Sequence, residues 1–113
     1  MCYDIIMSRK QKLSEAMGRK NTPVFSGFLK YFPDAIEEIA RVSFAGNEQH
    51  NKGQPLHWDR SKSTDEEDAG LRHLIDVAKG DKFDTDGIRH KAKYAWRALA
   101  SLQKELENDR KKV

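Results

Sequence analysis

The chain has 113 residues, which is enough for one compact domain and too few for two ordinary ones. Charged residues make up 35% of it and hydrophobic residues 37%, so the core is modest and we expect a homo-oligomer to complete it. Its single cysteine, Cys2, excludes an internal disulfide, and no apolar run approaches the roughly 18 residues of a membrane span. With no signal peptide evident, these features favour a cytoplasmic protein that does not enter a membrane.

Charge is distributed unevenly along the chain. Residues 1–32 carry six basic and two acidic side chains, residues 33–86 carry seven and thirteen, and residues 87–113 carry eight and three. An acidic centre between basic ends suits a site that holds cations centrally and meets phosphates with its flanks. A solvated surface with basic termini explains the same pattern, and composition alone favours this second interpretation.

The N-terminal region divides into a polar part and an apolar part. Residues 1–22 predict a loosely ordered basic arm, with at most a short helix near residues 11–17. Apolar and aromatic side chains then crowd residues 24–32. Such density predicts packing in the core or at a subunit contact more than a platform for stacking bases, although stacking stays open for one of these side chains.

The first main helix is expected over residues 33–46. Pro33 suits a first helical position, and Gly46 suits the residue that follows the last turn. Two adjacent carboxylates, Glu37 and Glu38, lie beside the apolar stripe of this helix. They are the first candidates for chemistry, and caps or surface acids are an equally good explanation.

A long loop over residues 47–63 precedes the second helix. Its apolar patch, residues 56–58, predicts that the loop docks there. Thr64 followed by Glu67 is a capping-box pattern that predicts the start of the second helix, and Gly80 predicts its end.

An acidic turn over residues 81–86 leads into a third helix whose apolar period runs from Ile88 to Leu106, beyond which the chain should fray. The sequence therefore predicts an all-α fold, a small bundle of three to four main helices. The expected organisation is a basic arm over residues 1–22, an all-α domain over residues 23–106 and a basic tail over residues 107–113.

Several acidic side chains on different helices are able to converge on a hard cation such as Mg²⁺, which prefers oxygen ligands and shares its shell with phosphates. His73 and His90 each follow an arginine on different helices and are candidates for a base, a ligand or a phosphate contact. Trp58 is a candidate for covering a base, although ordinary packing explains it as well. Basic candidates for phosphate contacts are Lys52, Arg72, Lys91, Lys93 and Arg97.

Some of these motifs recur together in a known family. Phe32 to Val42, a loop ending in a Trp, Leu71 to Leu74, Gly80 to Asp84, and Gly87 followed by His90 stand in this order. They resemble the phage and bacterial dATP/dGTP diphosphohydrolase (pyrophosphohydrolase) N-terminal domain over roughly residues 28–103. That family is similar to the MazG-like all-α nucleotide pyrophosphohydrolases, which bind Mg²⁺ or Mn²⁺ through a Glu-Glu-x-x-Glu motif and a later Glu-x-x-Asp.

The chain departs from those motifs at identifiable positions. Arg41 stands where the third glutamate belongs, and Asp81 replaces the glutamate of the second motif. Lys93 occupies a position where family members often carry a histidine. A site that adds His73, Asp76 or His90 to the carboxylates is a hypothesis that would complete the ligand set.

The resemblance implies hydrolysis of purine deoxynucleoside triphosphates to monophosphate and pyrophosphate, in phage nucleotide-pool control in the host cytoplasm, with Mg²⁺ (or Mn²⁺). The implied metal ligands are Glu37, Glu38, Asp76, Asp81 and Asp84. The implied catalytic residues are Glu38, His73 and His90. The implied substrate-binding residues are Lys52, Trp58, Arg72 and Arg97.

Two other functions stay open. One is a non-catalytic helical module that binds nucleic acid or regulates a partner through its basic ends. The acidic middle and the lack of a recognisable helix-turn-helix argue mildly against it. The other is a degenerate family member that binds nucleotide or a partner without turnover, which Arg41 in place of a ligand would explain.

Overall fold

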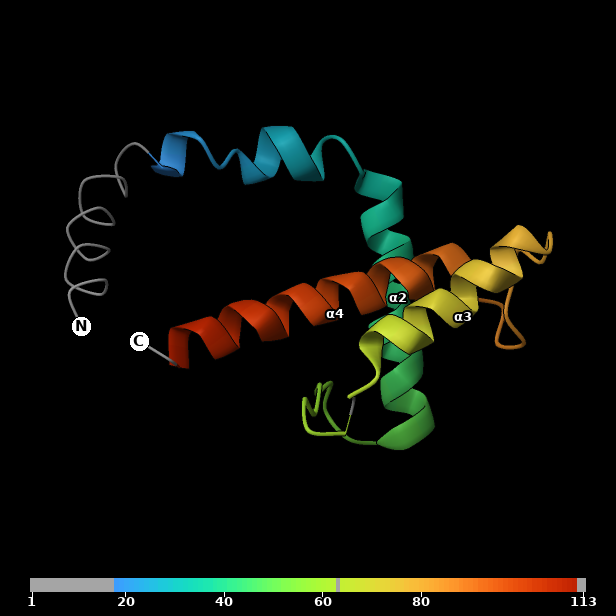
Figure 1. The fold of residues 1–113 in the computed structure, drawn as a ribbon. Helices are drawn as coiled ribbons and strands as arrows, with labels where there is room; N and C mark the ends of the chain where they lie inside the picture. The colour runs from blue at the N-terminus through green and yellow to red at the C-terminus, as the bar shows by residue number, and fades with distance from the viewer. Residues whose placement is uncertain (1–17, 63, 112–113) are drawn as a thin grey trace.

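The computed structural model describes residues 18–62 and 64–111, and this part of the chain is all-α (Figure 1). A five-residue π-helix, η1 (Phe25–Leu29), is followed by α2 (Pro33–His50), α3 (Glu66–Ala78) and α4 (His90–Lys111). Helices α3 and α4 form an antiparallel pair, and α2 crosses this pair on one side (Figure 1). The predicted fold class is therefore confirmed. The short helix expected near residues 11–17 lies outside the described residues.

Helix α2 begins as predicted and ends later than predicted. Pro33 is its first residue, but the helix runs through Gly46 to His50, so the expected stop at Gly46 is wrong. The extra turn is held by the buried side chain of Asn47, whose Nδ2 donates to Gln54 O at 3.0 Å and whose Oδ1 accepts from His57 N at 3.3 Å. These bonds to the following loop outweigh the roughly 1 kcal/mol that an interior glycine costs a helix.

Helix α3 starts without the predicted capping box. Its N-cap is Asp65, with no side-chain capping bond, so the start at Thr64 is wrong. The Glu67 carboxylate accepts a hydrogen bond from Ser101 of α4 and is drawn away from its own helix end. Gly80 ends the helix as predicted, with a φ of +87° that favours glycine.

Helix α4 begins at His90 and continues to Lys111, beyond the fraying expected after Leu106. Glu107 explains the additional turn, because it accepts hydrogen bonds from Arg60 at 2.8 and 3.0 Å and from Gln103 at 2.9 Å. Residues 112–113 lie outside the described part of the chain.

Small residues let α3 and α4 approach closely. The buried apolar side chains among the described residues are Ala69, Ile88, Ala92 and Ala100. A Cβ built on Gly70 would lie 3.3 Å from Arg97 Cβ, so a larger residue at this position of α3 would be in tight contact with α4. A close pair with small side chains has little space for a conventional core, and polar groups occupy much of the contact.

The long loop docks on α4 through Trp58. Its ring meets the Trp96 ring edge to face, with 5.6 Å between centroids, and Trp96 Nε1 donates to Ser43 Oγ of α2 at 2.8 Å. Of the predicted docking patch, Trp58 is half-buried, whereas Leu56 is 66% exposed.

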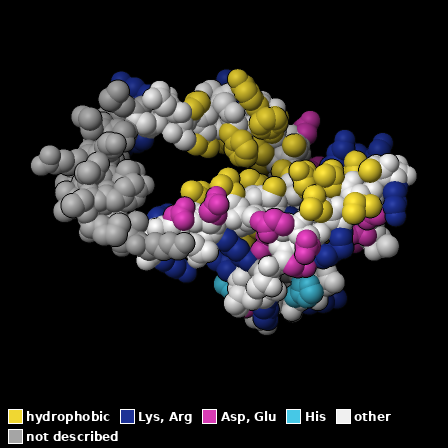
Figure 2. Space-filling model, viewed as in Figure 1, with side chains coloured by type: hydrophobic (Ala, Val, Ile, Leu, Met, Phe, Trp, Pro, Cys, Tyr) yellow, Lys and Arg dark blue, Asp and Glu magenta, His cyan; other side chains and the backbone are white. Residues whose placement is uncertain are grey.

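Many large apolar side chains remain exposed in the single chain. Residues 24–32 do not enter the core, since Phe25 is 64% exposed and Tyr31 is 71% exposed. A second set, which we call the apolar face, runs along the α3–α4 pair, and Figure 2 shows hydrophobic side chains over both regions. The apolar face consists of Leu71, Leu74, Ile75, Leu99, Leu102 and Leu106.

None of the helices in the described ranges combines the length and the apolar character needed to cross a bilayer.

Candidate metal centre

Three side chains from α3 and α4 bring possible metal ligands together. His73 and Asp76 lie three residues apart on α3, so they share one face of the helix, and His90 is the first residue of α4. The Nδ1 atoms of His73 and His90 are 2.9 Å apart, and His90 Nδ1 is 3.8 Å from Asp76 Oδ2. One ligand atom from each of the three residues lies within 4.8 Å of the others. We call these three residues the His–Asp–His cluster.

The turn between the helices places a second acid, Asp81, beside His90. Positive φ angles at Gly80 (+87°) and Gly87 (+81°) let the chain reverse within a few residues. His90 N then donates to Lys82 O at 3.1 Å, and His90 Nε2 lies 3.4 Å from Asp81 Oδ2. A carboxylate at Nε2 favours the tautomer whose Nδ1 lone pair faces His73 and Asp76.

Lys93 neutralises the remaining acids of the turn. Its ammonium lies 2.7 Å from both Asp84 Oδ2 and Asp86 Oδ2. The hydrogen bond from Lys93 lowers the pKa of Asp84 to about 2. Burial lowers the pKa of Lys93, but its bonds to the two carboxylates outweigh burial and raise that pKa above its ordinary value. Asp84, expected as a metal ligand, is thus engaged by a lysine.

The environment of His73 favours its neutral form. Burial lowers the pKa of His73, and the positive charge of Lys93 lowers it further. A neutral imidazole is the form that binds a metal ion. The charges around the cluster therefore suit a ligand role for His73.

The separation of the two imidazoles also suits one ion. Two nitrogen ligands about 2.1 Å from an ion and at a right angle lie about 3.0 Å apart, close to the 2.9 Å between the two Nδ1 atoms. Two imidazoles and one carboxylate are a donor set that divalent transition ions accept, whereas Mg²⁺ favours oxygen ligands. The residues present therefore fit a divalent transition ion better than Mg²⁺.

The structure does not bring Glu37 and Glu38 into the cluster. Both lie on α2, where Glu37 is exposed and Glu38 pairs with Arg41 at 3.3 Å. Arg41, which stands where the resemblance implies a glutamate ligand, therefore neutralises Glu38 on the same helix. Within the ranges that the structure describes, only the His–Asp–His cluster brings three or more such ligands together.

The predicted substrate-binding residues do not gather at the cluster either. Arg72 pairs with Asp65 at 3.1 Å, and Arg97 pairs with the buried Glu66 at 2.7 Å. Lys52 and Trp58 lie on the loop that leads to the N-terminal end of α3. The cluster lies at the other end of this helix, where α3 ends and α4 begins. Arg60 stacks on the Trp58 ring, 4.1 Å from its centroid, so a protein side chain already covers that ring.

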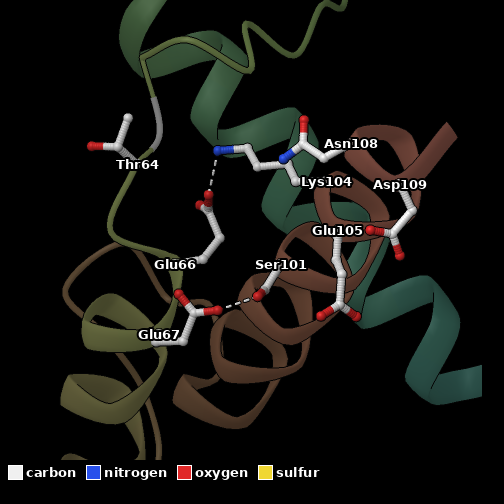
Figure 3. A pocket seen from close by; sticks show the side chains of 8 residues that line it. All are labelled: Thr64, Glu66, Glu67, Ser101, Lys104, Glu105, Asn108 and Asp109. Carbon is white, nitrogen blue, oxygen red and sulfur yellow. Dashed lines mark hydrogen bonds and ion pairs between the residues drawn. The ribbon is translucent and has the colours of Figure 1, made fainter. Parts of the chain in front are cut away.

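A hollow of about 430 Å³ lies at the opposite end of the α3–α4 pair (Figure 3). The buried Glu66 carboxylate there lies 2.5 Å from Lys104 Nζ and also pairs with Arg97. Glu67 bonds to Ser101 across the two helices, and Glu105 and Asp109 extend the acidic lining along α4 (Figure 3). The Glu66 network ties the N-terminal end of α3 to α4, which is a structural role.

Reasoning from the sequence missed two cations beside the cluster, Lys82 and Arg89. Together with Lys91, which was among the phosphate candidates, they line a cavity at the α3–α4 turn. The available signal was their position: Lys82 follows the Gly80-Asp81 pair and Arg89 directly precedes His90.

The fold and the cluster together define a small all-α protein with a group of side chains that could hold a metal ion. Residues 12–112 match the family described as dATP/dGTP diphosphohydrolase, N-terminal, and the chain belongs to this family. No curated protein and no solved structure matches the chain. The family inferred from the sequence motifs is thereby confirmed.

Proposed function

We propose that this protein hydrolyses purine deoxynucleoside triphosphates to monophosphate and pyrophosphate, with its active centre at the His–Asp–His cluster. The observation that carries the proposal is the convergence of His73, Asp76 and His90 within 4.8 Å in a chain of a diphosphohydrolase family.

We propose Mn²⁺ as the working cofactor, held by His73, Asp76 and His90. When bound, a divalent ion at such a site neutralises phosphate charge and makes water a better nucleophile at neutral pH. The low pKa of His73 keeps its imidazole in the form that can bind, and Asp81 orients the His90 ring through Nε2.

The reaction itself requires a water, a proton acceptor and a leaving group. Water attacks the α-phosphorus, the bond from this phosphorus to the α,β-bridging oxygen breaks, and pyrophosphate departs. The proton of the attacking water needs a nearby base, and Asp81, whose side chain is 61% exposed and beside His90, is the best-placed carboxylate. Asp84 and Asp86 are less suited to act as this base, because both form ion pairs with Lys93.

The test is pyrophosphate release from eight ribo- and deoxyribonucleoside triphosphates, each with Mn²⁺, Mg²⁺ or a chelator. We expect metal-dependent release that favours dATP or dGTP and is greater with Mn²⁺ than with Mg²⁺. Release that persists in the chelator, or no release from folded protein with any nucleotide, would contradict the proposal. The second result would favour the alternative of a binding module.

We also propose that the chain acts as a homo-oligomer. The apolar face and the exposed apolar and aromatic side chains of residues 24–32 together comprise twelve large side chains, each 38–71% exposed. If a fully exposed large side chain has about 200 Å² of accessible surface, these side chains together expose on the order of 1,000 Å². This area exceeds the roughly 800 Å² that each partner contributes to a standard interface. A second copy is the favoured occupant, because four buried apolar residues in the described ranges are few for a stable domain of this size.

A further inference from the structure

A cavity of about 260 Å³ lies directly beside the His–Asp–His cluster, at the turn from α3 to α4. Its lining is Val77, Gly80, Asp81, Lys82, Arg89 and Lys91. Asp81 belongs to both places, since it lines the cavity while its Oδ2 lies 3.4 Å from His90 Nε2. A group bound in this cavity would therefore lie next to the cluster.

Many cations around α3 and α4 are paired with acids, whereas those of this cavity, like Lys79 at the end of α3, form no ion pair with a described acid. Lys93, Arg97 and Lys104 each form an ion pair with an acid, and so do Arg60 and Arg72 on the surface. No ion pair joins Lys82, Arg89 or Lys91 to any acid of residues 18–62 or 64–111. Three cationic residues thus line one cavity, and the acid among its lining residues, Asp81, has its Oδ2 beside His90.

The arginine of this group is held in place by an aromatic ring. Arg89 lies over the Phe83 ring, 4.8 Å from its centroid, and an antiparallel bridge joins the backbones of the same two residues. Stacking occupies the flat face of a guanidinium and leaves its N–H edge for oxygen acceptors. Because Lys91 lies in the first turn of α4, the positive end of the helix dipole adds to the same charge.

We propose that this cavity binds the phosphate chain of the nucleotide, with Lys82, Arg89 and Lys91 as its ligands. The proposal rests on the function proposed above, since the cluster beside the cavity would be where the α-phosphorus reacts. The cavity is slightly smaller than the roughly 300–1,000 Å³ of sites for whole drug-sized ligands, which fits part of a nucleotide. This places the leaving pyrophosphate on cations without acidic partners rather than on Arg72 and Arg97.

The test measures binding of inorganic tripolyphosphate to the full chain by calorimetry, in a chelator and at low salt, so that neither turnover nor a metal contributes. We expect the variant Lys82→Gln with Lys91→Gln to bind at least about tenfold more weakly than the wild type. The matched control is Lys62→Gln with Lys79→Gln, which removes the same charge outside the cavity and should change the affinity less than about twofold. Circular dichroism would check that both variants are folded.

Three results with tripolyphosphate would overturn the proposal. They are no tripolyphosphate binding by the wild type, equal affinity in the wild type and the cavity variant, and an equal loss in the two double variants. A single-stranded oligonucleotide that binds more tightly than tripolyphosphate through the same lysines would also overturn it, in favour of a nucleic-acid site.

The outcome is separable from that of the proposed hydrolysis. Lysine-dependent tripolyphosphate binding without pyrophosphate release from any nucleotide would leave the cavity assignment standing and remove the enzymatic function. Turnover of dATP or dGTP, together with equal tripolyphosphate affinity in the wild type and the cavity variant, would support the enzymatic function and remove the cavity assignment.

Discussion

His73 Nδ1 and His90 Nδ1 lie 2.9 Å apart, on two antiparallel helices and 17 residues apart in the chain. At this distance one ring donates a proton to the other, or both lone pairs point to a shared ion. The first alternative makes the pair a polar contact between helices, and the second makes it a metal site.

Metal binding separates these alternatives. We expect His73→Ala and His90→Ala to weaken Mn²⁺ binding at least about 100-fold, because each removes one of three ligands. Calorimetry with Mn²⁺ at neutral pH would measure the affinity. His50→Ala, at the exposed end of α2, is the control and should bind as the wild type does. Unchanged affinity in both cluster variants would leave the histidines as a structural pair.

Turnover distinguishes the cluster from the acids of α2. We expect Asp76→Asn to lower pyrophosphate release at least about 100-fold, since it removes the carboxylate ligand. Glu38→Gln should retain turnover within about threefold, because Glu38 pairs with Arg41 outside the cluster. The motif-based hypothesis expects the loss in Glu38→Gln instead. Such a loss would place α2 in the active centre, for example through a neighbouring protomer.

Glu66 should be the most sensitive acid for stability. It is 3% exposed and bonds to Arg97 and Lys104, so Glu66→Ala would leave two cations beside a buried vacancy. We expect the free energy of unfolding to fall by about 3–5 kcal/mol. Chemical denaturation would measure it, with the exposed Asp68→Ala as a control that changes it by less than about 0.5 kcal/mol. Similar values for the two variants would refute the role given to Glu66.

The ion pairs of Lys93 should make part of the stability depend on pH. Because the pKa of Asp84 is lowered from 3.8 to about 2, its contribution is complete above about pH 4 and is lost as the pH falls toward 2. We expect Lys93→Met to be less stable than the wild type by about 1–2 kcal/mol at pH 7. This difference should shrink below about pH 4. Urea denaturation at several pH values would show it, and a difference independent of pH would rule out the ion pair as its source.

The apolar face should control assembly. We expect Leu99→Glu with Leu102→Glu to convert an oligomer to monomers, because the new carboxylates would be desolvated at the interface. Size-exclusion chromatography with light scattering would measure the mass. Leu56→Glu, at a leucine that is 66% exposed on the loop, is the matched control and should keep the wild-type mass. A monomeric wild type would contradict the proposed assembly.

Elements whose signals are local could be predicted from the sequence. Pro33 marks the start of α2, Gly80 the end of α3, and the apolar period of α4 its helical character, because each depends on neighbours within about four residues. The motifs also carried the family, which a match over residues 12–112 confirms.

Which of these residues act together depends on how the helices pack in three dimensions. Gly46 does not end α2, because Asn47 is bonded to the loop, and Glu67 does not cap α3, because it bonds to Ser101. The same reason applies to Arg97 and Lys104, since their partner Glu66 lies on another helix and no local period encodes the pairing. Packing of α3 against α4 engages Arg97 with Glu66, leaves Lys82 and Arg89 facing a cavity, and brings His73 to His90.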